Sequence, residues 1–452
     1  MLQLPLQYGP YNVGFRYHCI FDEGRFYQTS FPDNQTTLRP VPLNVWYPTQ
    51  KTAAKPNMRY QNYWDFESKE SALISFHERM KHHHIEKARL YFSGKEDKDW
   101  TEVDEKRFQQ LMQSQIMATK NAPVLEEAFP MIIYHQGLDA HIDDNALMLE
   151  YLASWGYVVV SSSFHPMDAK TLGIDWDLER SIADIEIIIQ YKKRKFHIKE
   201  NEIALIGHSF GAQVVLGFMG EKYANYRNSL KAAILQDTTI DYDFYTSNPK
   251  ILEILSSKQD QFQTPILAFA RLSSTFTWLN TLQYARRYYC KVGHVSHNDF
   301  VSIGAIAASL QSKNKHDNSA IVWQNYQQTC VLTLCFLDAF VKQIPQSQKL
   351  FEENAFEKMS ADGLQCEQLQ PGRTQRHFTP YQIGNSKAPT FEQLIELINR
   401  EGIDVFYQLY KQFPKASIFT PLIIKELGAY FSEYLRKPDI ASKIDGFHAR
   451  LP

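Results

Sequence analysis

The stretch Glu202–Val215, which reads E-I-A-L-I-G-H-S-F-G-A-Q-V-V, decides the fold of this chain. An apolar run at 203–206 leads into G-H-S-F-G at 207–211, and a helix-compatible segment follows at 212–218. The pattern predicts a strand, a sharp turn with Ser209 at its apex, and a helix. Glycines two residues on either side of the serine suit such a turn, because its strained backbone leaves little room for side chains.

The pattern G-x-S-x-G between a strand and a helix is typical of the nucleophile elbow of α/β-hydrolases. The same five-residue pattern also occurs by chance, so an ordinary strand–helix turn with a solvated serine is the alternative. The rest of the chain tests the two interpretations, because a serine nucleophile needs a base and a third group that orients the base.

Length and composition indicate a well-packed globular protein. The chain has 452 residues, enough for two or three domains or for one large α/β domain with additions. Hydrophobic residues make up 44% of it and aromatic residues 13%. Lys and Arg total 48 against 50 Asp and Glu, and we find no basic stripe with interleaved aromatic residues. We therefore expect no nucleic-acid partner.

Metal-binding, membrane and export signals are missing from the sequence. The five cysteines show no C-x-x-C or other metal-binding spacing, and the three consecutive histidines at 82–84 cannot share one face of a helix. No apolar run reaches the roughly 18 residues of a transmembrane span. The N-terminal residues lack the apolar core of a signal peptide, so we expect a cytoplasmic protein or an exported one whose leader has been trimmed.

Strand and helix patterns alternate over most of the chain, which predicts a mostly parallel central sheet flanked by helices. The predicted strands are 13–21, 42–47, 129–134, 157–161, 203–206, 232–235, 265–270 and 288–292. The first two would form an antiparallel hairpin at one edge of the sheet. The predicted helices are 145–154, 178–191, 248–256, 276–286, 302–311 and 322–341.

Three further segments stand outside this alternation. Residues 51–123 are highly charged, have helical periodicity at 67–92 and 102–120, and interrupt two strands, so we predict a helical insertion that is either a lid or a solvated addition. Residues 359–379 are polar with Gly and Pro and predict a linker after a hydrolase domain at 1–358. Short helices at 380–452 resemble one or two helical-repeat units, which would dock on the main domain or form a homo-oligomer contact.

Chain order predicts the acid that accompanies Ser209, because α/β-hydrolases place the acid and then the histidine after the nucleophile. Asp237 is the first carboxylate after Ser209 that follows an apolar strand pattern. The competing position after the next strand has no acid, since residues 261–298 contain neither Asp nor Glu. We therefore predict Asp237 as the acid, with Asp241 and Asp243 as alternatives deeper in the loop.

The base should lie on the loop after the last predicted strand, where G-H-V-S-H-N-D-F at 293–300 offers two histidines. A helix start is predicted directly after His297, with the carboxylate of Asp299 favourable at its N-terminus. This position favours His297 over His294 as the base. The alternative is that both histidines are solvated loop residues.

An oxyanion hole needs two backbone N–H donors directed at the developing charge. We predict the N–H of Phe210, the residue after the nucleophile, and the N–H of Leu138 on the loop after the first central parallel strand. Gly137 permits close approach of the backbone at that loop. This chemistry needs no metal and no organic cofactor, so we expect neither.

Four segments resemble platelet-activating-factor acetylhydrolases and their bacterial dienelactone-hydrolase-like relatives. They are the hairpin segments V-G-F at 13–15 with N-V-W-Y-P at 44–48, the oxyanion segment 129–138, the elbow 207–212 and H-N-D-F at 297–300. The resemblance covers roughly residues 10–345. It implies an α/β-hydrolase fold, it favours His297 because a phenylalanine follows the histidine by three residues in that family, and it agrees with Asp237 as the acid.

Two departures limit what the resemblance implies. Gln136 stands where the family usually has histidine, and residues 51–123 and those after 379 have no counterpart in the mammalian enzymes but look like additions in bacterial relatives. Dienelactone hydrolases proper use a cysteine nucleophile, so Ser209 does not imply that activity.

The sequence thus predicts a serine hydrolase acting on a small-molecule carboxylic ester, with a short acyl chain or a lipid-like group. Ser209 would attack the carbonyl, His297 would carry the proton and Asp237 would orient the imidazole. One alternative is a peptidase of the prolyl-oligopeptidase type, although the chain shows no propeller-length N-terminal domain. The other is a non-catalytic α/β-hydrolase scaffold that binds a partner through its C-terminal helices.

Overall fold

The structure is a computed structural model. It describes all residues except 1, 29–35, 51–55, 67–70, 94–99, 139, 166–176, 192–195, 242–247, 273, 275, 312–318, 353–354, 361–363, 373–393, 396, 400–401, 415–418, 420, 434–436 and 449–452. Within the described ranges, no helix has both the length and the apolar character needed to cross a membrane.

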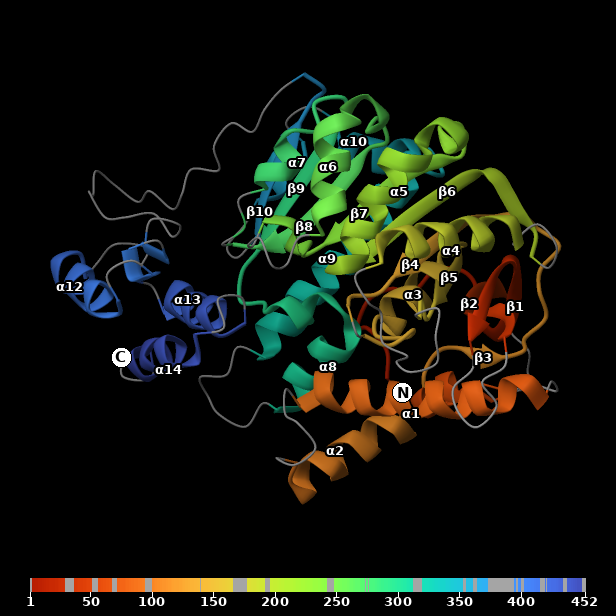
Figure 1. The fold of residues 1–452 in the computed structure, drawn as a ribbon, viewed down its shortest axis with the longest axis horizontal. Coiled ribbons are helices and arrows are strands. Elements are labelled where there is room, and N and C mark those ends of the chain that lie inside the picture. Colours follow the sequence, from red (N-terminus) through yellow and green to blue (C-terminus); the bar gives the residue numbers. More distant parts are fainter. Residues whose placement is uncertain are drawn as a thin grey trace.

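The centre of the fold is a ten-stranded mixed sheet (Figure 1) with the order β10-β9-β8-β7-β6-β4-β5-β2-β1-β3. Neighbouring strands from β5 to β9 run parallel, whereas the β1–β2, β2–β5 and β9–β10 pairs are antiparallel. The strands are β1 Asn12–Gln28, β2 Thr36–Thr49, β3 Thr119–Lys120, β4 Phe129–His135, β5 Val158–Ser162, β6 Ile198–His208, β7 Leu230–Gln236, β8 Ile266–Arg271, β9 Arg287–Val292 and β10 Leu364–Leu369. The predicted mostly parallel sheet is confirmed.

Helices cover both faces of the sheet (Figure 1), because side chains alternate between the faces along each strand. Ile206 of β6 belongs to one apolar cluster and its neighbour Leu205 to another. The first cluster includes α3 Ala146–Ser154, α8 Ser302–Gln311 and α9 Ser319–Phe340, and the second includes α4 Leu178–Tyr191, α5 Phe210–Tyr226, α6 Pro249–Ser257 and α7 Thr277–Asn280. Short elements are α10 Pro345–Leu350, η4 Thr239–Asp241, η5 Gln259–Gln261, η6 His297–Phe300 and η7 Glu357–Met359.

The insertion at 51–123 is built into the main core. It contains η1 Tyr60–Trp64, α1 Ser71–Ser93, α2 Glu102–Gln113 and the edge strand β3. Its buried aromatic residues belong to the same apolar cluster as α3 and α9. Tyr63 accepts a hydrogen bond from Trp46 Nε1 at 3.0 Å and donates one to Glu150 Oε1 on α3 at 2.8 Å. A solvated addition elsewhere on the domain is therefore the wrong description of this segment.

Three local predictions are wrong because tertiary pairing decides them. The helix predicted at 276–286 ends at Asn280, since the chain has to turn before it enters β9 at Arg287. Part of the predicted linker at 359–379 is a strand, β10, which pairs antiparallel with β9. A six-residue strand at the edge of a sheet is hard to predict from the sequence, because it pairs with only one neighbouring strand. The helix predicted at 102–120 also ends early, at Gln113.

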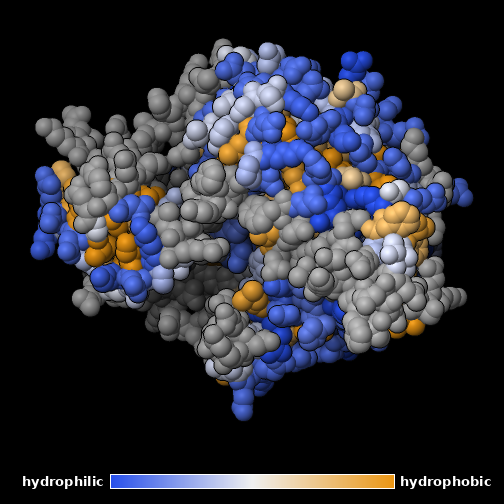
Figure 2. All heavy atoms as spheres, in the orientation of Figure 1, coloured by the Kyte–Doolittle hydropathy of each residue, from blue (hydrophilic) through white to orange (hydrophobic). Residues whose placement is uncertain are grey.

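The C-terminal helices have an apolar cluster of their own. They are α12 Asp404–Gln412, α13 Pro421–Glu433 and α14 Pro438–His448, drawn in blue at the left of Figure 1. Their cluster is centred on buried Phe406, Ile424 and Ile444 and shares no member with the clusters of the sheet. Figure 2 shows apolar side chains of this unit among polar ones on the face in view.

Candidate active site

Ser209 occupies a strained turn between β6 and α5. Its backbone has φ 54° and ψ −120°, a conformation that non-glycine residues rarely adopt. The Ser209 N–H donates to the backbone oxygen of Gln236, at the end of the neighbouring strand β7, over 3.0 Å. The strand, turn and helix predicted around the serine are all present.

The two glycines of the elbow are required by close backbone contacts. A Cβ atom on Gly207 would lie 2.2 Å from the backbone oxygen of Gly211. A Cβ atom on Gly211 would lie 2.1 Å from the backbone oxygen of His135 on β4. Both obstacles are backbone atoms, which cannot rotate away as a flexible side chain could. The turn is therefore tied to β4 as well as to its own helix.

Asp237 and His297 form a hydrogen-bonded pair. Asp237 follows β7, is fully buried and has a positive φ of 44°. His297 begins η6 on the loop after β9, and its Nδ1 lies 2.6 Å from Asp237 Oδ2. An ionised carboxylate only accepts hydrogen bonds, so Nδ1 carries the proton and Nε2 is left as the basic atom. The structure thus brings together the predicted acid and base across 60 positions of sequence.

The alternative residues lie differently. The Oδ1 atom of Asp241 accepts the backbone N–H of Trp278 at the start of α7, over 2.9 Å. Burial raises the pKa of Asp241 to about 6. Asp243 lies outside the described residues. His294 has φ 56° three residues before His297, and the bond to Asp237 is made by His297.

His208, the residue before Ser209, holds the histidine loop. Its Nε2 lies 3.0 Å from the backbone oxygen of His297, and the two imidazole rings are 4.7 Å apart between centroids. Burial, and then the neighbouring His297, lower the pKa of His208 to about 3. His208 is therefore neutral near pH 7 and donates from Nε2, because a carbonyl oxygen can only accept.

The loop after β4 brings Gly137 against Ser209. A Cβ atom built on Gly137 would lie 3.1 Å from the Cβ atom of Ser209. The N–H of Ala140 donates to the Gly137 oxygen over 3.3 Å, which leaves the Leu138 N–H on the opposite side of the same planar peptide. Phe210 is the first residue of α5, at the N-terminus of that helix. The oxyanion roles of Leu138 and Phe210 stay predictions.

Comparison with solved structures relates this geometry to a known fold. A ferulic acid esterase from Streptomyces cinnamoneus superposes with a TM-score of 0.51 over 81% of this chain and 99% of that chain, at 13% sequence identity. The protein has the α/β-hydrolase fold. A family model described as "Protein of unknown function (DUF1749)" matches residues 149–352. No curated protein matches the chain.

The comparisons show the fold and do not single out the acetylhydrolases that the sequence segments resemble. Among the residues that the structure describes, no group of three or more His, Cys, Asp or Glu could hold a metal ion. Of the three neighbouring histidines on α1, His84 packs its ring against Phe66 and His141 in the protein interior.

Arg271 is a neighbour of Asp237 that the sequence did not indicate. It ends β8, its side chain is buried, and its Nε lies 3.4 Å from Asp237 Oδ2. Its backbone N–H donates to Asp237 Oδ1 over 3.4 Å. The guanidinium therefore lies beside the carboxylate that is bonded to His297. The only available signal was an arginine directly after an apolar strand.

Asn145 ties the site to the helices behind it and was also missed. Its Nδ2 donates to the side chain of Gln236, next to Asp237, over 3.1 Å. Its Oδ1 accepts from Tyr326 Oη at 2.6 Å and from the Ser302 N–H at 3.1 Å. These partners lie on α9 and at the start of α8, so one buried amide joins the loop after β4 to β7 and two helices.

The insertion reaches the predicted oxyanion loop. Tyr91 of α1 donates a hydrogen bond to the Leu138 carbonyl over 3.3 Å. Trp64 of η1 donates from Nε1 to Asp143 Oδ1 over 3.0 Å. Both acceptors belong to the chain between β4 and α3, so the insertion contacts that loop directly.

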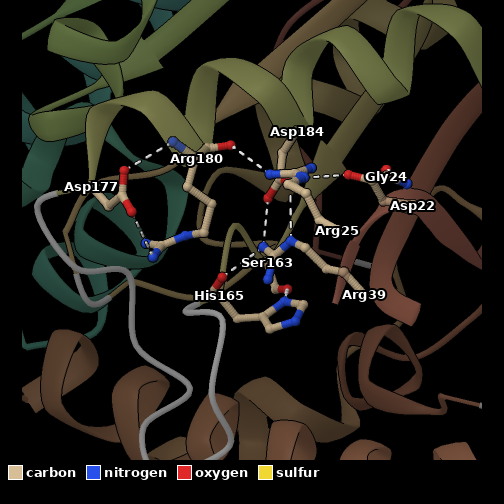
Figure 3. A network of polar contacts seen from close by, with 9 residues as sticks. All are labelled: Asp22, Gly24, Arg25, Arg39, Ser163, His165, Asp177, Arg180 and Asp184. Atoms are coloured by element: carbon tan, nitrogen blue, oxygen red, sulfur yellow. Dashed lines mark hydrogen bonds and ion pairs between the residues drawn. The ribbon is translucent and has the colours of Figure 1, made fainter. Parts of the chain in front are cut away.

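A buried ion-pair network holds the neighbouring loop after β5 (Figure 3). Asp184 of α4 contacts the guanidinium groups of Arg25 and Arg39 from the N-terminal hairpin, with 2.7 Å between Arg39 Nη2 and Asp184 Oδ2. Burial works to raise the pKa of Asp184, but the two arginines outweigh it and hold that pKa below its usual value. Arg39 Nη2 also donates to the His165 backbone oxygen over 2.6 Å.

The loop after β5, which this network holds, lies beside the end of β4. Phe164 stacks on His135 of β4 with 3.8 Å between ring centroids, and its φ is 46°. Gln136 Nε2 donates to the Ser163 backbone oxygen over 3.2 Å. Gln136, which replaces the histidine usual in the acetylhydrolases, therefore links the loop after β4 to the loop after β5.

Proposed function

We propose that this protein is a serine hydrolase that cleaves carboxylic esters. The observation that carries the proposal is the hydrogen bond of 2.6 Å between Asp237 Oδ2 and His297 Nδ1. Both residues, like Ser209, follow the carboxyl ends of parallel strands, which lie at the same edge of the sheet. A strained serine, a buried acid and an acid-bound histidine, in this chain order, are the parts that acyl transfer requires.

In the proposed reaction the Ser209 hydroxyl attacks the ester carbonyl while His297 Nε2 takes its proton. Asp237 stabilises the imidazolium that forms. The N–H groups of Phe210 and Leu138 stabilise the negative oxygen of the tetrahedral intermediate. The imidazolium then protonates the leaving alcohol, and a water activated by the same histidine releases the acyl group from Ser209.

The substrate class that we propose is an ester with a short acyl chain or a lipid-like group. Support comes from the segments that resemble platelet-activating-factor acetylhydrolases, above all the elbow and H-N-D-F at 297–300. The ferulic acid esterase shares the fold at low identity and does not decide the acyl group.

Labelling with a fluorophosphonate tests the nucleophile. We expect the wild-type protein to be labelled at Ser209, and the Ser209→Ala variant, folded as judged by circular dichroism, to remain unlabelled. Absence of labelling in the wild type would favour the non-catalytic binding scaffold over an enzyme.

A substrate panel tests the reaction class separately. We expect p-nitrophenyl esters from acetate to laurate to be hydrolysed with a preference for short chains, and peptide anilides to be left intact. Faster Ser209-dependent cleavage of the anilides would contradict the esterase proposal and support a peptidase instead.

A further inference from the structure

Two cysteines face each other across the outermost strand pair of the sheet. Cys290 of β9 is the direct partner of Cys366 of β10 in the antiparallel register. Their Sγ atoms are 3.4 Å apart, and both side chains are buried in the cluster that also contains Tyr288. The contact joins residues 76 positions apart, and the strand that supplies Cys366 was not predicted from the sequence.

The backbone geometry at this pair suits a covalent bond. Residues directly opposite each other in an antiparallel pair have Cα atoms about 4.5 or 5.5 Å apart and side chains on the same face. Disulfides span Cα distances of roughly 4.4–6.8 Å. We propose that Cys290 and Cys366 are a disulfide-forming pair, which a small organic disulfide oxidises so that β10 becomes covalently joined to β9.

The chemistry is a thiol–disulfide exchange in two steps, with oxidised glutathione as the example oxidant. The first nucleophile is Cys366, because it lies on the edge strand and keeps 7% exposure, whereas Cys290 is fully buried and its burial raises its pKa well above the usual value. The Cys366 thiolate attacks a glutathione sulfur, forms a mixed disulfide and releases one glutathione. Cys290 then gives its proton to solvent, attacks the Cys366 sulfur and releases the second glutathione. Two protein thiols are oxidised and one small disulfide is reduced.

The bond would stabilise the edge of the sheet next to the histidine loop. β9 ends at Val292, five positions before His297, and β10 is the outermost strand of the sheet, paired with β9. A cross-link that closes this loop restricts the unfolded chain and so raises the temperature of unfolding.

The test uses the full-length protein in its native buffer. The protein is incubated with oxidised glutathione, its remaining thiols are blocked with iodoacetamide, and it is then digested without reduction for mass spectrometry. We expect a peptide that links Cys290 to Cys366, and a Tm that rises by a few degrees and returns on reduction. Cys366→Ala should lose both effects, whereas the matched variant Cys335→Ala, which removes a half-buried thiol of α9, should keep them.

Two results would overturn the proposal, and both are read in the wild-type protein, so they do not depend on how well the variants fold. One is a stable glutathione adduct on Cys366 with no linked peptide. The other is five free thiols after the incubation.

Discussion

At Asp237 one buried carboxylate receives hydrogen bonds from the His297 ring and from the backbone of Arg271. The first of these bonds fixes the imidazole tautomer, because Nδ1 must carry a proton to donate it. An amide at this position could present its NH₂ group to Nδ1 and so favour the opposite tautomer. The identity of the residue therefore matters more than its size.

We predict that Asp237→Asn lowers kcat/KM for an ester substrate by a factor of the order of 10⁴, while the fold is retained. Asp241→Asn is the matched control, because Asp241 bonds to the N-terminus of α7 and should leave kcat/KM within a few-fold of wild type. Steady-state kinetics with p-nitrophenyl acetate decide the matter. Equal losses in the two variants would remove Asp237 from its proposed role.

His208 contacts His297, the predicted base, through the backbone oxygen of that residue. Its Nε2–H bond to the His297 carbonyl is buried, and a neutral buried hydrogen bond contributes about 1 kcal/mol, or roughly fivefold in rate if it aligns the base. We predict that His208→Phe lowers kcat about fivefold with little change in KM, and that His208→Gln, which can donate the bond again, restores part of the loss. A KM effect without a kcat effect would indicate a substrate contact instead.

At the scale of elements, the hairpin β1–β2 and helix α4 are joined by ions rather than by apolar packing alone. Asp184 and Arg39 are both almost completely buried, and their contact is part of the network in Figure 3. Removing one member of a buried pair leaves the other charge without its counter-ion, which usually costs about 3–5 kcal/mol. An exposed pair between α4 and α6, Glu179 with Lys250, should contribute roughly 0–1 kcal/mol.

We predict that Asp184→Asn lowers the free energy of unfolding at pH 7 by about 3 kcal/mol or more, and that Glu179→Gln lowers it by about 1 kcal/mol at most. Urea denaturation followed by tryptophan fluorescence measures both. Comparable losses in the two variants would show that the buried network is no stronger than a surface pair.

The pH dependence of the same network follows from the lowered pKa of Asp184. A depressed folded-state pKa contributes stability that is present above the unfolded value, about 3.9, and is lost as the pH falls through the folded value. Wild type should therefore lose stability below about pH 4 more steeply than Asp184→Asn. Parallel curves of unfolding free energy against pH for the two proteins would contradict this assignment.

At the scale of the whole molecule, the two additions to the α/β domain differ in how they are held. The insertion shares its apolar cluster with α3 and α9, whereas α12–α14 form a separate cluster. Lys425 of α13 interacts electrostatically with Asp299, two residues after His297. Burial raises the pKa of Asp299, and the charge of Lys425 is among the groups that oppose the rise. We propose that residues 380–452 fold as a distinct unit.

We predict that a chain ending at residue 372 stays folded and keeps Ser209-dependent labelling, because no residue of the main apolar clusters is removed. A chain that lacks residues 56–122 should fail to fold, since it loses a large part of the first cluster. Circular dichroism and fluorophosphonate labelling compare the two. Loss of labelling in the chain that ends at residue 372 would show that the C-terminal helices help to build the site.

Size-exclusion chromatography with light scattering, on the full-length protein and on the chain that ends at residue 372, tests the predicted homo-oligomer contact. If the C-terminal helices form it, only the full-length chain should exceed the monomer mass. A monomeric full-length protein would contradict that role.

The sequence by itself determined the elbow, the alternation of strands and helices and the pairing of Asp237 with His297. The elbow depends on backbone strain within five residues, and the alternation on periodicity within single elements. The contact between Asp237 and His297 could be predicted because chain order and a stretch without Asp or Glu left few candidates.

Only the tertiary structure decided which distant groups support those residues. Arg271 beside Asp237, His208 beneath the His297 loop, and Asn145 between the loop after β4 and α9 are contacts whose partners lie 34 to 181 positions apart. The tertiary structure also decided strand β10 and the burial of the insertion. An edge strand forms only by pairing with its neighbour, and an aromatic side chain is buried only where other elements pack around it. Local pattern specifies backbone geometry, but the partner of a buried polar or aromatic group is set by packing, which depends on the whole chain at once.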